Sequence, residues 1–489
     1  MTLARRLGTS SFIYTTTGAL QKGFLLLLLP VYTRYLSPND YGIVAVITAM
    51  TSLLVILLML SLHGAMTRFY FELRHDSQEL KEFWGTVLVF VFLMTVGGGS
   101  LLLLVGKHLL KPMIGQIPFW PYAALGVGTA IFQPFWLILL ALLQTREKVR
   151  EFACLNLAQF FLNLGLVLAL VVLLGWGATG PLTANLIAAA AFFLVALFVL
   201  RNEYTICIRL SHLKRALSYS LPLVPHSLAS QITAITDRLF VNQMMGTASA
   251  GIYSVGFMLG GAMNLVSDGV NKAYVPISMD ILQSGQEESL KSLRRMGLVL
   301  VTLYAALATL ISFFSKEILQ VLTSEAYHES YIVVPYIAFG FVLGGIYYLL
   351  VNILFFVTHA TRYVALSTVI GAGSNILLNM ILIPAQGMRG AAIASLLSQL
   401  VIVIFVALVG RFYEVVRWDY GRFAVVSLAC LAASILMARV RLQDTFALVA
   451  LKATVFLIMW FLVNFMMWRD PFYLTRRGRL LLRKLPALG

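Results

Sequence analysis

The sequence predicts an all-α integral membrane protein, and three observations lead to this fold class. Hydrophobic residues make up 60% of the 489 residues and charged residues only 11%. The mean hydropathy is +0.89, and apolar stretches long enough to cross a bilayer core of about 30 Å recur along the chain. Soluble domains contain roughly 45–50% apolar residues, and disordered chains combine low hydrophobicity with high charge. Both classes are therefore excluded.

About fourteen apolar stretches are predicted as membrane-spanning helices. The first follows Arg5 and Arg6, as in a signal peptide, but Lys22 interrupts it and no small-residue cleavage site follows. We therefore expect an uncleaved helix. The predicted helices cover residues 10–34, 41–65, 84–106, 119–142, 152–175, 179–200, 217–241, 249–273, 294–314, 331–357, 363–384, 388–410, 420–438 and 446–468.

The basic residues, which outnumber the acidic ones by 36 to 20, predict the orientation. Loops facing the cytoplasm carry an excess of Lys and Arg. With the N-terminus inside, 25 of the 36 fall on the cytoplasmic side and 7 on the outer side. We expect a multi-pass membrane protein with both termini cytoplasmic. Because topology accounts for most of the net charge of +16, a nucleic-acid partner is not expected.

An internal repeat divides the chain. Residues 34–46 resemble residues 242–255, with Gly42 aligned to Gly251 at an offset of 209 residues. Thr145 aligns with Thr358 at 213, and residues 177–180 align with 387–390 at 210. Three matches in the same order indicate two homologous halves.

Each half has six helices, an even number, so both enter the membrane in the same orientation around a central cavity. The predicted division is an N-terminal lobe over 1–205, a C-terminal lobe over 206–412, two extra helices over 413–468 and a basic cytoplasmic tail over 469–489. The three cysteines are far apart and indicate neither a disulfide framework nor a metal site.

Two segments carry a family resemblance, PVYTRYLSPNDYGIVAV from Pro30 and TDRLFVNQMMGTASAGIYSVGF from Thr236. With the fourteen-span layout, the chain resembles the polysaccharide transporter (Wzx-type flippase) family of the multidrug/oligosaccharidyl-lipid/polysaccharide exporter superfamily. The resemblance implies lobes that alternate between inward-open and outward-open forms. It also implies as cargo a polyprenyl-pyrophosphate-linked oligosaccharide, such as an O-antigen, capsule or exopolysaccharide repeat unit, and a polysaccharide polymerase and chain-length regulator as partners beside the membrane lipids. It does not fix the glycan.

Cationic side chains within predicted helices are candidates for cargo binding, because an ionisable group inside a span costs about 3 kcal/mol. Lys22, Arg238 and Lys272 are suited to a pyrophosphate, Arg as a fork for phosphate oxygens and Lys as a point charge. Arg238 could instead extend to the membrane surface, as we expect of Lys452.

Acidic and imidazole side chains in the spans are candidates for counter-charge or ion coupling. Asp237 and Asp268 would balance a positive cavity or take up a proton or sodium ion, and His63 and His226 could carry protons. The structural alternatives stay open. Asp268 and Lys272 lie four residues apart, where they can neutralise each other, and the histidines can be packing elements.

Other functions are weighed against export of a lipid-linked glycan. A drug exporter for cationic cargo would favour an acidic cavity, and lipid II transport is chemically close. A membrane-embedded glycan polymerase or glycosyltransferase would need reactive clusters in outer loops. The longest outer loops, 107–118 and 315–330, are expected to be solvated. We expect no enzyme activity, catalytic residue, metal or cofactor beyond a coupling H⁺ or Na⁺.

Overall fold

Apolar segments of this length fold as helices, because only a helix satisfies all backbone polar groups within one segment of a membrane. The computed structural model describes residues 17–18, 20–21, 23, 28–284, 286–357, 360–413, 416–438, 440 and 445–468, and all regular elements in them are helical. Ten of these helices are long and apolar enough to cross a membrane. The chain is an all-helical, multi-pass membrane protein. Most of the predicted helix 10–34 lies outside the described residues.

The first part of the chain forms an N-terminal bundle. Its elements are α2 (Pro38–Met59), α3 (Leu62–Leu73), α4 (Ser77–Leu109), α5 (Lys111–Ile114), η1 (Phe119–Ala123), α6 (Ala124–Thr145), α7 (Val149–Val167), η2 (Leu168–Leu173), α8 (Thr179–Leu200) and α9 (Leu210–Ser220). Its apolar core includes Phe83 and Trp84 of α4 and Trp136 of α6.

The second part forms a C-terminal bundle. Its elements are η3 (Leu221–Leu223), α10 (Val224–Met245), α11 (Thr247–Gly260), α12 (Ala262–Ser284), α13 (Glu287–Phe313), α14 (Ser315–Leu322), η4 (Glu325–Ile332), α15 (Val334–Phe356), α16 (Thr361–Phe412), α17 (Tyr420–Met437) and α18 (Thr445–Trp468). Most of its core lies between α13, α15 and α16.

Local sequence explains where α2 begins. Ser37 and Asp40 form a reciprocal capping box, and Pro38 occupies the first turn, where its missing N–H would have no partner in any case. The helix ends at Leu60, which adopts φ +49°, and Ser61 follows at φ +54°. The single helix predicted for 41–65 is therefore two helices, α2 and α3.

The long helix α16 contains the two predicted spans 363–384 and 388–410. The chain reverses at Gly387, where φ is +60°, a left-handed conformation that glycine adopts without a steric penalty. Gly177, its partner in the repeat, also has a positive φ of +52°. The turn between the last two helices of each half is thus built on glycine at the same repeat position.

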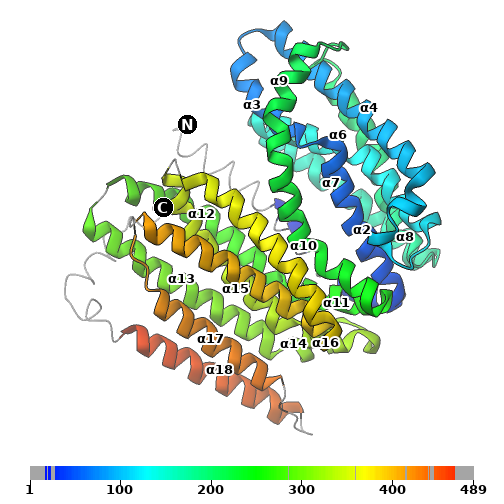
Figure 1. Cartoon of the computed structure of the whole chain (residues 1–489). Coiled ribbons are helices and arrows are strands. Elements are labelled where there is room, and N and C mark those ends of the chain that lie inside the picture. The colour runs from blue at the N-terminus through cyan, green and yellow to red at the C-terminus, as the bar shows by residue number, and fades with distance from the viewer. Residues whose placement is uncertain are drawn as a thin grey trace.

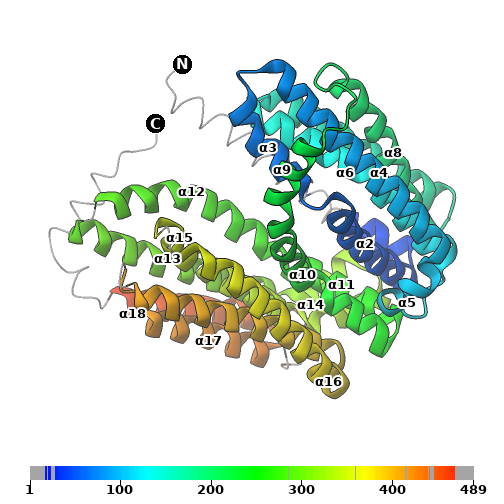
Figure 2. The ribbon, with the colours of Figure 1, turned by 45° about the horizontal axis from the view of Figure 1, so that its top comes forward.

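The two bundles are in contact at α2 and α11. Toward the opposite end of these helices the bundles lie farther apart (Figures 1 and 2). A shared apolar cluster joins the bundles at their contact, with Val46 and Met50 from α2, Val241 from α10 and Tyr253 from α11. Helices α2 and α11 approach each other closely near their starts, at Gly42 and Gly251. Because α10 packs against both α2 and α16, polar groups on this helix lie where the bundles face each other.

Candidate functional site

Asp237 is buried in α10 and accepts hydrogen bonds from four side chains of other helices. The Tyr253 hydroxyl donates to Oδ2 at 2.6 Å, and the amides of Asn375 and Asn379 donate to Oδ1 at 3.1 and 2.8 Å. The Ser395 hydroxyl, in the second half of α16, also donates to Oδ2. The Asp237 cluster therefore joins α10, α11 and both halves of α16.

These hydrogen bonds compensate for burial of the carboxylate, since each hydrogen bond to a charged group contributes about 1.5–3 kcal/mol. The ion pairs among the described residues do not include Asp237. Nearby, Asn379 Oδ1 is buried and has no hydrogen-bond partner there. Carboxylate, amide and hydroxyl oxygens are the ligands that hard cations prefer. The cluster contains one buried carboxylate and one amide oxygen that has no partner in the described part of the chain.

Arg238, the next residue on α10, lies instead in a cavity of about 490 Å³. Its guanidinium carbon lies 4.4 Å from the Phe257 ring centroid, and its Nε is buried without a hydrogen-bond partner in the described part of the chain. The described residues that line the cavity carry one charged side chain, Arg238, among polar groups that include Ser230, Gln231, Thr233, Asn264, Ser267, Tyr347, Tyr348, Ser395 and Gln399. This cavity presents a single positive charge in neutral polar surroundings.

Lys272 and Asp268 form an ion pair on α12, with Nζ and Oδ2 3.1 Å apart. Their side chains are 54% and 37% exposed, and neither belongs to the described lining of the Arg238 cavity. The geometry agrees with the alternative in which the two charges neutralise each other. Lys272 is thus not brought together with Arg238.

The two histidines predicted as site residues are not part of the described lining of the Arg238 cavity. His63 is in the first turn of α3, with Nδ1 buried and without a partner in the described part of the structure. His226 is exposed in the first turn of α10. Lys22 lies outside the described residues. In the ranges that the structure describes, no three His, Cys, Asp or Glu side chains are placed to hold a metal ion.

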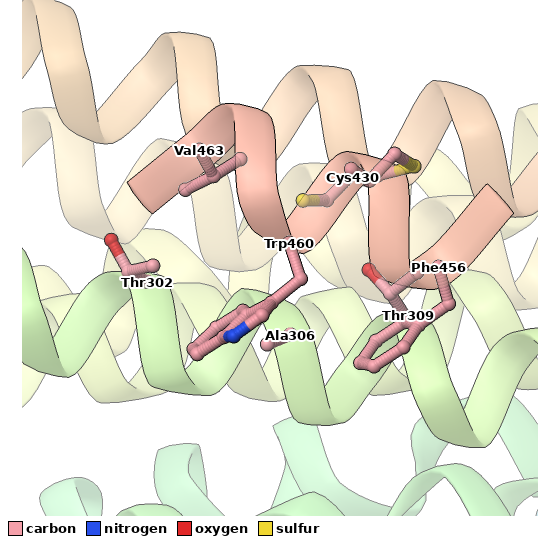
Figure 3. Close-up of a pocket in the computed structure, with 8 residues that line it drawn as sticks. Thr302, Ala306, Thr309, Cys430, Phe456, Trp460 and Val463 are labelled. Carbon is pink, nitrogen blue, oxygen red and sulfur yellow. The ribbon is translucent and has the colours of Figure 1, made fainter. Parts of the chain in front are cut away.

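A small pocket separates α18 from α13 and α17 (Figure 3). Phe456 and Trp460 project from α18 toward Thr302, Ala306 and Thr309 of α13. Its volume is about 10 Å³, at the lower limit for one water molecule. This pocket is a packing feature.

Lys452 also attaches α18 to the bundle. Its Nζ lies 2.6 Å from Glu317 Oε1 of α14, and its side chain is 4% exposed. The expectation that Lys452 reaches the membrane surface is wrong, because an acidic partner lies within reach inside the protein.

An apolar groove of about 550 Å³ runs between α15, α16 and α17. Its wall consists mainly of Leu, Ile, Val, Phe and Ala side chains, and it also includes Arg411 and Tyr420. Arg411 lies in the last turn of α16, and Tyr420 is the first residue of α17. Arg411 and Tyr420 therefore lie at one end of a mainly apolar groove, and Ser427 is a further polar residue of its wall.

The sequence profile of one family, described as "Polysaccharide biosynthesis protein", matches residues 7–282. This range covers more than half of the chain, including α2 to α11 and most of α12. The chain belongs to the polysaccharide biosynthesis protein family. The resemblance to polysaccharide transporters is thus confirmed as membership of this family.

One curated protein is similar to this chain in sequence. The "Lsg locus putative protein 1" of Haemophilus influenzae is 24% identical over 282 residues, which are 56% of this chain and 66% of the relative. The alignment thus spans slightly less than two thirds of the relative's length.

Solved structures show the same fold. A structure described as "Lipid II flippase MurJ, inward closed conformation" superposes with a TM-score of 0.70 at 16% identity, covering 94% of this chain and 99% of the other. An inward-facing multidrug resistance MATE family transporter of the MOP superfamily gives a TM-score of 0.62 at 14% identity, covering 83% and 96%. The polysaccharide biosynthesis protein therefore has a MurJ/MATE-like transporter fold.

Sequence reasoning found Asp237 and Arg238 of this family member but missed the side chains around them. Tyr253, Asn375 and Asn379 are uncharged, so the search for intramembrane charges passed over them. Asn375 and Asn379 are both fully buried, and their spacing of four residues in an apolar helix puts them on one face. That spacing was the available signal.

Proposed function

We propose that this polysaccharide biosynthesis protein is a flippase that moves polyprenyl-pyrophosphate-linked oligosaccharide from the cytoplasmic to the outer leaflet. The observation that carries the proposal is the Arg238 cavity, in which one cation faces neutral polar groups next to the Asp237 cluster. Family membership and the transporter fold support it.

The cavity meets the main energetic demand of such cargo. A phosphate group passing through hydrocarbon without compensation would lose its hydration at a prohibitive cost. A guanidinium offers two parallel donors to phosphate oxygens, and Arg238 Nε has no competing partner in the described part of the chain. The surrounding amides and hydroxyls can replace water around the rest of the head group.

We further infer fourteen spans in two homologous lobes, 1–205 and 206–412, followed by two extra helices over 413–468 and a cytoplasmic tail over 469–489. The reciprocal approach of Gly42 and Gly251 and the matching turns at Gly177 and Gly387 support this division. With both termini cytoplasmic in a bacterial inner membrane, α2 and α11 begin at the outer face. The end that the Gly42 and Gly251 contacts hold together is then the outer end.

Ion coupling is assigned to Asp237 in this proposal. Asp237 is 3% exposed and surrounded by neutral donors, so loss or gain of a cation there would change the hydrogen bonds that join three helices. Asp268 is paired with Lys272, and His63 and His226 lie outside the cluster, which leaves them less suited to the role. The coupling ion is H⁺ or Na⁺.

The apolar groove between α15, α16 and α17 supports the lipid part of the proposal. A polyprenyl chain is hydrocarbon, and the groove buries such a chain against Leu, Ile and Phe side chains while Arg411 remains near its end. With residue 411 on the cytoplasmic side, the pyrophosphate would be near the inner leaflet. Membrane lipids, a polymerase and a chain-length regulator are proposed as partners.

The competing assignments have distinct signatures. A cation exporter would be expected to present acidic groups to the Arg238 cavity, whereas its described lining carries Arg238. Lipid II shares the pyrophosphate and differs in its glycan. An embedded polymerase or glycosyltransferase would extend or transfer glycan when purified, and such turnover would overturn the proposal.

The test replaces Lys22, Arg238 and Lys272 singly with Ala and measures outward display of the lipid-linked glycan in cells. We expect loss of display with Arg238→Ala. Lys316→Ala, at an exposed basic residue of α14, serves as the control and should transport normally. Normal display by all three variants would contradict the cationic cavity.

A further inference from the structure

The N-terminal bundle contains a second polar cavity, of about 160 Å³, to which no role has been given. Its described lining carries no charged side chain. It consists of Thr48, Thr51, Ser52, Gly126, Thr129, Gln133, Trp136, Gln159, Asn163, Leu182, Asn185, Ala189 and Phe192. Amide and hydroxyl groups at this density are costly inside a membrane protein unless they find hydrogen-bond partners.

Several of these groups have unused hydrogen-bonding capacity. In the described part of the chain, no hydrogen bond is formed by the side chains of Gln133 and Gln159. Asn163 Nδ2 donates to Asn185 Oδ1 at 2.8 Å, which leaves Asn163 Oδ1 and Asn185 Nδ2 without a partner among the same residues. The cavity therefore offers both donors and acceptors to a ligand.

The cavity occupies the repeat-related position of the Arg238 cavity. Asn185 corresponds to Ser395 at the offset of 210 residues, and Thr48 corresponds to Phe257 at 209. Trp136 and Gln133 correspond to Tyr347 and Gly344 at 211, between the offsets of the flanking repeats. The two cavities are thus lined from equivalent positions in the two bundles.

The difference between the two cavities is their charge. At the offset of 209 residues, Asp237 and Arg238 correspond to Leu28 and Leu29. Leu28 and Leu29 are both buried apolar residues. The described lining of the N-terminal cavity therefore has no counterpart of Arg238, and it carries the amides of Gln133, Gln159, Asn163 and Asn185.

Side chains that line the two cavities are hydrogen-bonded to each other. Gln231, which lines the Arg238 cavity, donates from Nε2 to the Ser52 hydroxyl of the neutral cavity at 2.7 Å. A ligand with a phosphate next to an uncharged polar group can therefore place each part in a matching cavity. In a glycan linked to a lipid through pyrophosphate, the first sugar directly follows the phosphate.

We propose that the neutral cavity binds an uncharged sugar ring of the cargo, with the adjacent phosphate at Arg238. Hydroxyl groups of a hexose can pair with Gln133, Gln159 and Asn163, and a sugar's apolar face can pack on the indole of Trp136. A site built to hydrogen-bond hydroxyls discriminates strongly against ligands that lack them. This inference rests on the proposed function and assigns glycan specificity to the N-terminal bundle.

The experiment uses the full chain in lipid nanodiscs and saturation-transfer NMR. The probes are the methyl glycosides of glucose, galactose, mannose and N-acetylglucosamine, with geranyl pyrophosphate as a sugar-free phosphate probe. Gln133→Leu is compared with Gln144→Leu, a matched change at an exposed position of the same helix. We expect at least one glycoside to bind the wild type and Gln144→Leu, and to bind Gln133→Leu at least tenfold more weakly.

Geranyl pyrophosphate provides the folding control, because its binding should be unchanged in Gln133→Leu. Should Gln133→Leu fail this control, Trp136→Phe replaces it with a smaller change of packing and the same expected loss of glycoside. Equal glycoside affinity of the wild type and the cavity variant, or no glycoside binding to the wild type, overturns the inference. Unchanged binding of geranyl pyrophosphate to Arg238→Gln would overturn the proposed function while leaving the sugar site intact.

Discussion

Gly42 and Gly251, aligned by the internal repeat, each contact the backbone at the start of the other's helix. A Cβ added to Gly42 would lie 1.9 Å from the Thr247 carbonyl oxygen, and one added to Gly251 would lie 2.0 Å from that of Pro38. Pro38 and Thr247 are themselves separated by the repeat offset of 209 residues. The contact that closes one end of the two bundles is thus reciprocal.

Substitution of Gly42 by Ala should separate the bundles at this end. The added methyl group collides with backbone rather than with a flexible side chain, so the helices must move apart. Spin labels at Asn39, which is exposed, and at Ser249, which is half-buried, on a cysteine-free background should report a distance longer by several ångströms.

Gly373→Ala is the matched control, because a Cβ there meets nothing within 4 Å. It should leave the distance between the labels unchanged. The same distribution in Gly42→Ala as in the wild type would show that this end of the bundles is not held by the glycine contact.

Replacement of Asp237 by Asn should abolish ion-coupled transport. The four donors around the carboxylate would then face an amide that cannot accept from all of them, and the negative charge for a coupling cation would be lost. Glycan transport driven by an imposed sodium or proton gradient is the measurement.

Ion binding at Asp237 can also be measured through the thermal unfolding midpoint, in the wild type and in Asp237→Asn. If the coupling ion is sodium, sodium chloride should raise the thermal unfolding midpoint of the wild type relative to potassium chloride. Asp268→Asn, at a partly exposed ion pair, should retain the response. Full gradient-driven transport by Asp237→Asn would refute coupling at this residue.

Lys452→Met should destabilise the attachment of α18. It leaves the Glu317 carboxylate buried without its cation, at a cost of about 3–5 kcal/mol for a broken buried pair. Thermal unfolding in nanodiscs should show a lower midpoint for the single variant and partial recovery when Glu317→Gln is added. Independent, additive effects of the two changes would show that the pair is not coupled.

Hydropathy located most of the described helices, because a segment buried in lipid must satisfy its backbone within itself. The predicted helix 249–273 is two helices, α11 and α12. Hydropathy did not predict the break at Leu60 and Ser61, where neither glycine nor proline marks the left-handed residues. The turn at Gly387 falls between the predicted spans 363–384 and 388–410, as hydropathy placed them.

The site was only partly predictable. Asp237 and Arg238 stood out because charges are costly in a span, but charge alone gave Lys272 equal weight although Asp268 pairs with it. The partners of Asp237 on α16 lie 138 or more residues away. Such partnerships depend on how helices pack, which composition and periodicity do not specify.

The most direct test of the central claim is transbilayer movement in proteoliposomes of a fluorescent polyprenyl-pyrophosphate-linked saccharide, followed by quenching from outside. Loss of a charged hydrogen-bonding group worth about 1.5–3 kcal/mol corresponds to a rate reduction of roughly ten- to a hundredfold. Arg238→Gln should show this reduction, and Arg238→Lys should retain part of the activity because it keeps the charge without the fork. Equal rates for the wild type and Arg238→Gln would contradict the account.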